Sequence, residues 1–281
     1  MKGQIIKNIR DNFDVLINDE IITCKCRGKT RLDETIPLVG DFVLIDKEHK
    51  TIEKILERSN YIIRPNVANI TQGIITTSFK NPDFDLNLLD KLLVELEINK
   101  IKPIICMTKK DLLTNDEYLK YKKILDYYKK IGYRVLYNTE IKELKKELKD
   151  NVSVFMGQTG AGKSTLLNKL FKELNLKTGE VSLALGRGRH TTRHVEIIIK
   201  DDIKVLDTPG FSALSFINYT KEDMKNAFKE FKEYPCPYKD CMHIKETECS
   251  IKKAVSNGDI LESRYNNYKS FMEELLNNKK W

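Results

Sequence analysis

A glycine-rich segment, residues 157–164, constrains the fold of this chain more than any other feature. It reads G-Q-T-G-A-G-K-S and fits the pattern G-x-x-x-x-G-K-[ST]. The apolar run 152–156 precedes it, and Leu166, Leu167 and Leu170 follow at helical spacing. Between a strand and a helix, such a loop turns its backbone N–H groups toward phosphate oxygens. A chance glycine turn is the alternative, and the flanking strand and helix argue against it.

The residue types in this segment predict a nucleotide site that includes Mg²⁺. Lys163 would reach the β- and γ-phosphates and stabilise charge during phosphoryl transfer, and Ser164 would coordinate the metal ion. Lys163 is therefore also a candidate catalytic residue. Nucleotide contacts are expected from Gly157, Gln158, Thr159, Gly160, Ala161, Gly162, Lys163, Ser164 and Thr165.

A second nucleotide motif, D-T-P-G at residues 207–210, follows the apolar run 203–206. Asp207 at the end of a strand can hold Mg²⁺ through water, and the N–H of Gly210 can meet the γ-phosphate. The same four residues could form an ordinary turn. Their position about forty residues after the first motif favours the nucleotide interpretation.

Between these two motifs lies G-R-G-R-H-T-T-R, residues 186–193. Its glycines give freedom of movement, its arginines attract phosphate, and Thr191 and Thr192 can each offer a hydroxyl to Mg²⁺. These are the properties of a nucleotide-sensing switch loop. A basic loop that contacts RNA is the competing interpretation, and the two are compatible.

A fourth motif predicts the identity of the base. In GTPases, N-K-x-D after an apolar strand reads guanine through its aspartate, and here T-K-K-D follows the run 103–107. We expect nucleotide contacts from Thr108, Lys109, Lys110 and Asp111, with the Asp111 carboxylate accepting from guanine N–H groups. Thr108 departs from the pattern, because it has no amide. A lysine-rich loop without this role is the alternative.

The order of the motifs is unusual. In Ras-like GTPases the base-reading motif comes last, whereas here it precedes the other three. A circularly permuted GTPase domain would bring all the pieces together in space, with residues 137–139 as a candidate for the remaining base-contact loop. Strands are expected at 73–77, 103–107, 133–137, 152–156, 194–199 and 203–206, and helices at 86–96 and 116–130. This alternation predicts an α/β domain with a mainly parallel sheet and helices on both faces.

The first 60 residues have a different pattern. Short β-type runs at 4–7, 13–17, 21–27, 42–45 and 51–56 are separated by polar or glycine-containing turns. Five short strands in so few residues fit an OB-fold β-barrel, although another small β-module is not excluded by strand count.

Cysteine spacing predicts a metal site near the C-terminus. Cys236, Cys241, His243 and Cys249 offer three thiolates and one imidazole, a set that suits tetrahedral Zn²⁺ with no open coordination position. One structural zinc per chain is therefore expected. Unligated thiols beside an incidental histidine are the alternative. After residue 212 no strand is expected, and this tail is predicted to be helical.

Composition and charge limit the partners and the cellular location that the chain can have. The net charge of +8, from 49 Lys+Arg against 41 Asp+Glu, is compatible with an RNA partner, but a lysine-rich proteome would give the same excess. No uncharged apolar run approaches the roughly 18 residues that span a bilayer, and the N-terminus lacks a signal-peptide pattern. A cytoplasmic protein without membrane contact is expected.

With these motifs in this order, the chain resembles the ribosome small-subunit-dependent GTPase A family over essentially its whole length. R-P-N-V-A-N at residues 64–69 is similar to that family's segment between barrel and GTPase. The resemblance implies three domains: an OB-fold RNA-binding barrel at 1–66, a circularly permuted GTPase at 67–215 and a zinc-knuckle helical domain at 216–281. It also implies a monomeric cytoplasmic bacterial GTPase. Such an enzyme hydrolyses GTP to GDP when stimulated by the 30S ribosomal subunit, assists late maturation of that subunit and binds its 16S rRNA.

The sequence departs from Ras-like GTPases at the position of the water-activating residue. Ras-like enzymes orient water with a glutamine after the D-x-x-G glycine, but here that position is Phe211. His190 in the switch loop is the candidate catalytic residue, because its imidazole can accept from water near neutral pH. A purely RNA-docking role for His190 is the alternative.

Two rival functions stay open on sequence alone. One is a nucleic-acid-binding module that keeps a P-loop fold without turnover. The other is a permuted GTPase that serves the large ribosomal subunit, although the barrel and the cysteine cluster speak against it.

Overall fold

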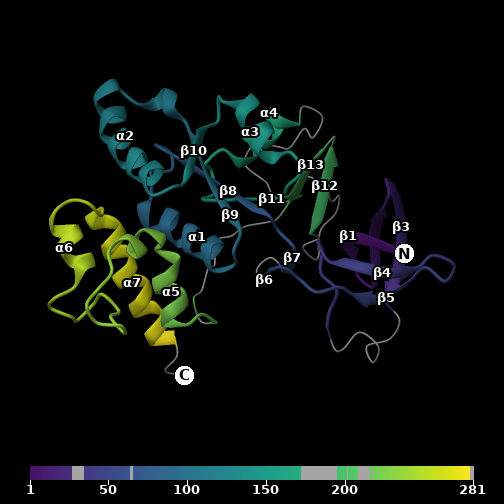
Figure 1. The fold of residues 1–281 in the computed structure, drawn as a ribbon. Coiled ribbons are helices and arrows are strands. Elements are labelled where there is room, and N and C mark those ends of the chain that lie inside the picture. The colour runs from purple at the N-terminus through teal and green to yellow at the C-terminus, as the bar shows by residue number, and fades with distance from the viewer. Residues whose placement is uncertain are drawn as a thin grey trace. The chain divides into compact units, whose positions relative to one another are not determined.

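The five apolar runs at the N-terminus are strands in the computed structural model, which describes residues 1–26, 35–63, 66–171, 195–200, 202–207, 216 and 218–278. These strands are β1 (Lys2–Ile9), β2 (Asn12–Ile17), β3 (Glu20–Cys26), β4 (Phe42–Asp46) and β5 (Thr51–Ile55). Strand β1 pairs antiparallel with both β2 and β4, β2 with β3, and β4 with β5, whereas β3 and β5 run parallel. The pairing closes on itself in the order β1-β2-β3-β5-β4 (Figure 1). The prediction of a five-stranded barrel is confirmed.

Alternating side chains fill the barrel. Ile5, Val15, Val43 and Ile52 come from four different strands, and each is fully buried. This period of two is the expected pattern for strands with one face toward a core and one toward water.

A buried ion pair holds the chain segment that leaves the barrel. Asp41 is fully buried, and its two carboxylate oxygens each accept from Arg58 at 2.7 Å, from Nε and from Nη2. Two parallel charge-assisted bonds fix both distance and orientation. The segment after β5 is thereby tied to the loop before β4.

The chain divides into two compact units. The first comprises Met1–Ile74, Thr139–Met156 and Gly162–Phe211, and the second Ile75–Asn138, Gly157–Ala161 and Ser212–Trp281. The division into domains at residues 66 and 215 stays a prediction.

The first unit adds further strands and two helices to the barrel. They are β6 (Tyr61–Ile63), β7 (Asn66–Ala68), α3 (Ile141–Leu148), β11 (Val152–Met156), α4 (Lys163–Leu170), β12 (Glu196–Lys200) and β13 (Ile203–Asp207). Strand β11 runs parallel to β13, and β12 joins β1 through the pair Lys7 and Glu196. Strand β8 (Gln72–Ser78) begins in this unit and ends in the second.

The sheet is less parallel than the sequence predicts. Strand β12 pairs antiparallel with β13, with Lys200 opposite Ile203. A connection this short can only form a hairpin, because parallel neighbours need a crossover of a dozen or more residues. Helix α3 and the small β6–β7 sheet were also not expected.

The second unit holds α1 (Leu86–Ile98), β9 (Lys102–Thr108), η2 (Lys110–Leu112), α2 (Asn115–Lys130), β10 (Arg134–Tyr137), α5 (Lys221–Ala227), η3 (Lys229–Glu233), α6 (Ser250–Ser256) and α7 (Glu262–Asn278). Strands β9 and β10 are parallel, and α1 packs against α5 and α7. From residue 216 onward, none of the described residues lies in a strand, as the sequence predicts.

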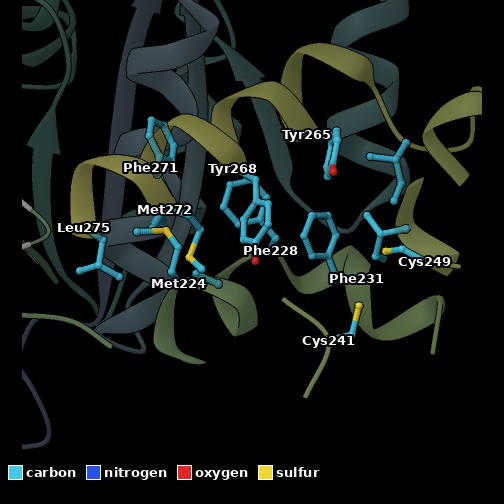
Figure 2. Packing of buried hydrophobic residues seen from close by; sticks show 14 of the residues in the cluster. Met224, Phe228, Phe231, Cys241, Cys249, Tyr265, Tyr268, Phe271, Met272 and Leu275 are labelled. Atoms are coloured by element: carbon cyan, nitrogen blue, oxygen red, sulfur yellow. The ribbon is translucent and has the colours of Figure 1, made fainter. Parts of the chain in front are cut away.

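An aromatic-rich core holds the C-terminal helices together. It includes Phe228 and Phe231 from the segment around η3, and Tyr268 and Phe271 from α7. In Figure 2 these rings lie side by side, and Phe231 and Tyr268 meet edge to face at 5.0 Å between centroids. Cys241 and Cys249 lie at the end of the same cluster. The predicted metal ligands therefore adjoin a packed core.

Candidate nucleotide site and metal cluster

The glycine-rich loop has the predicted context of strand, turn and helix. Strand β11 ends at Met156, and α4 begins at Lys163 with Gly162 as its N-cap. Gly157, Gly160 and Gly162 have φ angles of 129°, 80° and 95°. Glycine adopts such positive values without steric cost. The loop can therefore turn its N–H groups toward one point in front of α4.

Gly157 is also required by a close approach of two backbones. A Cβ atom at this position would lie 2.0 Å from the carbonyl oxygen of Thr76 in β8. No other residue fits between the loop and that strand without displacing the backbone. Packing therefore requires glycine at position 157, in addition to the predicted role of this residue in phosphate binding.

The base motif adjoins the glycine-rich loop through Thr108, the residue that departs from the family pattern. The Thr108 hydroxyl donates to the carbonyl oxygen of Ala161 at 2.6 Å, and the carbonyl of Thr77 lies 3.3 Å away. Thr108 is 1% exposed. Two motifs that are about fifty residues apart in sequence are therefore in direct contact in the permuted order.

The two lysines of the base motif have different surroundings. The ammonium of Lys110 lies 3.9 Å from the ring centroid of Tyr118 and 5.2 Å from that of Tyr137, a cation–π arrangement. Lys109 has a left-handed backbone, with φ of 58°, and its ammonium donates to the carbonyl of Asn81. Asp111 is exposed at the first turn of η2, so its carboxylate is open to a ligand.

The segment predicted as a further base-contact loop lies beside this motif. The backbone N–H of Asn138 donates to the carbonyl of Met107 at 2.9 Å. Strands β9 and β10 run parallel with Met107 opposite Tyr137, so both ends meet at one edge of the sheet.

Lys163 is partly buried at the start of α4. Burial disfavours its charged form and lowers the pKa of the ammonium to about 8. A phosphate brought to this position would favour the charged form again. Binding of an anion beside Lys163 would therefore be coupled to protonation of its side chain.

Asp207 ends β13, which runs parallel to β11 with Val154 opposite Leu206. Its backbone thus lies at the edge of the sheet where the glycine-rich loop begins. His190, Thr191, Thr192 and Gly210, with the rest of the switch loop, lie outside the described residues. The roles assigned to individual nucleotide-site residues stay predictions.

The four predicted metal ligands converge. Their ligand atoms all lie within 4.8 Å of one another. Each of the three sulfurs is 3.4 Å from Nδ1 of His243, and the sulfurs of Cys236 and Cys249 are 3.7 Å apart. A disulfide is excluded at that separation, since an S–S bond measures about 2.05 Å. A tetrahedral ion with metal–sulfur bonds of about 2.3 Å requires about 3.8 Å between sulfurs and about 3.5 Å from sulfur to nitrogen. The cluster fits one four-coordinate metal ion.

Residues outside the ligand set hold His243 in place, and the sequence did not indicate them. The Glu246 carboxylate accepts the N–H groups of Met242 and Ile244, both at 2.9 Å. From α7, Tyr265 donates to the carbonyl of His243 at 2.6 Å and Tyr268 to that of Met242 at 2.7 Å. His243 has a φ of 56°, an uncommon backbone that these four bonds stabilise. The acidic residues of the ligand loop were the sole sequence signal for this support, and the sequence does not show which of them accepts the N–H groups.

The fold and these sites define a circularly permuted GTPase with a C-terminal Cys₃His cluster. The chain belongs to the RsgA GTPase family. The family model described as RsgA GTPase matches residues 55–217, and that of the RsgA N-terminal domain matches residues 2–53.

Relatives and solved structures agree with this placement. The small ribosomal subunit biogenesis GTPase RsgA of Latilactobacillus sakei is 44% identical, over 97% of this chain and 95% of its own length. The protein of the same name from Clostridium botulinum strain Hall is 43% identical over 100% of both. The crystal structure of YloQ, described as a circularly permuted GTPase, has a TM-score of 0.84 at 34% identity and covers 100% of this chain and 96% of its own. YjeQ from Thermotoga maritima has the same score and identity, with 98% coverage of both chains.

Proposed function

We propose that this GTPase acts on the small (30S) ribosomal subunit, assists its late maturation and binds its 16S rRNA. The name of the relatives, small ribosomal subunit biogenesis GTPase, supports the small subunit as partner. The observation that best supports the nucleotide specificity is the contact between Thr108 and Ala161, because it joins the T-K-K-D segment to the glycine-rich loop.

The reaction would be in-line attack of water on the γ-phosphate, giving GDP and phosphate. The N–H groups of the glycine-rich loop and the ammonium of Lys163 would stabilise the charge that develops on the phosphate oxygens. Asp111 would select guanine. Ser164, Asp207 and one of Thr191 and Thr192 would hold Mg²⁺, which would offset the negative charge of the phosphates.

Zinc is the metal that the C-terminal cluster would take. Three thiolates and an imidazole favour Zn²⁺, and four protein ligands leave no position for substrate. The ion would therefore stabilise the loop 236–249 and take no part in hydrolysis.

We also propose that this GTPase is a monomer in the cytoplasm. Among the described residues, no helix has both the length and the apolar character that a membrane crossing requires. Ribosomal subunits are cytoplasmic, which supports the location.

The decisive experiment is GTP hydrolysis with and without purified subunits. We expect slow turnover alone and strong stimulation by 30S subunits. Stimulation by 50S subunits instead would identify a large-subunit factor. RNA affinity that does not depend on nucleotide, with no turnover on either subunit, would identify a binding module. Asp111→Asn should shift preference from GTP toward xanthosine triphosphate, and an unchanged preference would remove Asp111 from base recognition.

His190 is proposed as the residue that orients the attacking water, since Phe211 has no donor or acceptor. His190→Ala should abolish most subunit-stimulated turnover while GTP binding and subunit binding are retained. Loss of subunit binding in proportion to activity would instead make His190 a docking residue.

A further inference from the structure

A cavity of about 190 Å³ opens beside the metal cluster, within the second unit. Its walls come from α5, η3 and the chain that leads to Cys241. Lys225, Lys232, Lys239, Tyr234, Pro235 and Tyr238 form its outer lining, and the ligand side chains Cys236 and His243 lie deeper. Nothing in the GTPase reaction uses this cavity.

The lysines and acids that line the cavity are unequally represented. Three lysines line it, and no aspartate or glutamate does. Lys225 forms a salt bridge with Glu222 at 2.9 Å. Lys232 and Lys239 are exposed and form no salt bridge with any described residue. An anionic group entering the cavity could therefore pair with the two exposed ammonium groups of Lys232 and Lys239.

The lining also presents ring surfaces. Tyr238 is 54% exposed, and Pro235 before the first ligand is also exposed. Their backbones are held: the N–H of Cys241 donates to the carbonyl of Tyr238 at 3.2 Å, and Ser250 donates to that of Pro235 at 2.8 Å. The cavity wall is thus fixed by the same loop that carries the metal ligands.

We propose that this cavity binds one unpaired nucleotide of a single-stranded RNA segment, with its base against Tyr238 and its phosphate near Lys232 and Lys239. Sites for whole small molecules occupy about 300–1,000 Å³, so a cavity of this size suits one unit of a longer strand. Proteins recognise unpaired RNA by stacking bases on aromatic side chains while basic residues follow the backbone. An acidic peptide would satisfy the lysines but not the exposed ring. The inference rests on the proposed function, because it assigns a contact to the RNA partner.

The test measures binding of the full chain, loaded with its metal, to a fluorescein-labelled unstructured RNA of about ten nucleotides. Lys232→Ala with Lys239→Ala should weaken binding and lower the salt dependence by about one phosphate contact. Tyr238→Ala should weaken it about fivefold or more, and Tyr238→Phe should retain most of the affinity. The matched controls are Lys221→Ala with Lys253→Ala, two exposed lysines outside the cavity, and Leu119→Ala, an apolar residue of α2 that is 55% exposed and also lies outside the cavity.

Equal losses in the cavity and control variants would overturn the proposal, as would equal affinity for a duplex of the same sequence. So would a poly-glutamate peptide that binds with the same dependence on Tyr238. Metal content of each variant shows that the loop is intact. Subunit-stimulated hydrolysis separates the two hypotheses. If the unaltered chain is not stimulated by 30S subunits, the proposed function fails. If it is stimulated but the cavity variants bind RNA normally, only the cavity assignment fails.

Discussion

The hydroxyl of Thr108 is 2.6 Å from the carbonyl oxygen of Ala161, and this bond attaches the end of β9 to the phosphate loop. The usual motif has asparagine at this position. Here the contact is made by a threonine hydroxyl, and Thr108 is 1% exposed. Thr108 therefore tethers the base motif to the phosphate loop.

We expect Thr108→Val to weaken GTP binding about fivefold or more, since valine has the same shape but cannot donate, and an unpaired buried carbonyl costs about 1–3 kcal/mol. Thr108→Ser keeps the donor and should stay near the unaltered affinity. Calorimetric titration with GDP and GTP measures both. If Thr108→Val bound as tightly as Thr108→Ser, the hydrogen bond would not position the loop.

Nucleotide affinity should fall as pH rises through about 8 and above. Without ligand the pKa of Lys163 is lowered to about 8 by burial, and phosphate oxygens beside it would raise that pKa, so binding takes up a proton in this window. Titrations of GDP in buffers of different ionisation enthalpy measure the uptake. Guanosine, which has no phosphate, serves as the control and should show no such dependence. Equal proton uptake for both ligands would assign the effect to another group.

The lowered pKa of Lys163 also makes the free energy of unfolding depend on pH. The unfolded chain binds more protons than the folded chain above about pH 8, because the pKa of Lys163 is lowered only in the folded state. Its contribution to the free energy of unfolding therefore rises with pH in that range.

Glu246→Gln should weaken metal retention about tenfold, the lower end of the effect of outer-shell partners. The two carboxylate oxygens of Glu246 accept separately, one from the N–H of Met242 and one from the N–H of Ile244. A glutamine has one accepting oxygen, so its amide NH₂ would face one of these two backbone N–H groups. Transfer of metal to a chromophoric chelator measures the change. Glu248→Gln, an exposed acid in the same loop, is the matched control. Identical retention in both variants would show that Glu246 does not support the site.

The sequence predicted the parts of this protein that depend on local pattern. Alternating apolar residues located the barrel strands, and the glycine loop with its flanking run located β11 and α4. The spacing of Cys236, Cys241, His243 and Cys249 located the metal cluster. What it could not show depends on contacts between distant segments: the tether from Thr108 to Ala161 and the bonds from α7 to the ligand loop. The direction of β12 could have been predicted, because only a short gap separates it from β13.

A buried ion network gives the sharpest stability prediction. Arg264 of α7 is fully buried and reaches Asp90 of α1 at 2.6 Å, and its Nε and Nη2 donate to Glu230. Asp90 also accepts from Tyr128 and Asn267, at 2.6 and 2.7 Å. Burial nevertheless raises the pKa of Asp90. The carboxylates of Asp90 and Glu230 thus share the single guanidinium group of Arg264.

Arg264→Met should therefore cost about 3–5 kcal/mol in the free energy of unfolding, because it leaves two buried carboxylates without their counterion. Adding Asp90→Asn and Glu230→Gln to Arg264→Met should recover part of the loss, since the uncompensated charges are removed. Urea unfolding followed by the aromatic signal of the C-terminal core measures both. Lys91→Met is the matched control, because Lys91 and Glu274 join the same two helices at 2.9 Å while partly exposed to solvent, and such pairs contribute about 0–1 kcal/mol. If Arg264→Met and Lys91→Met cost the same, or if the triple variant is less stable than Arg264→Met alone, the network does not hold α7 to α1 through its charges.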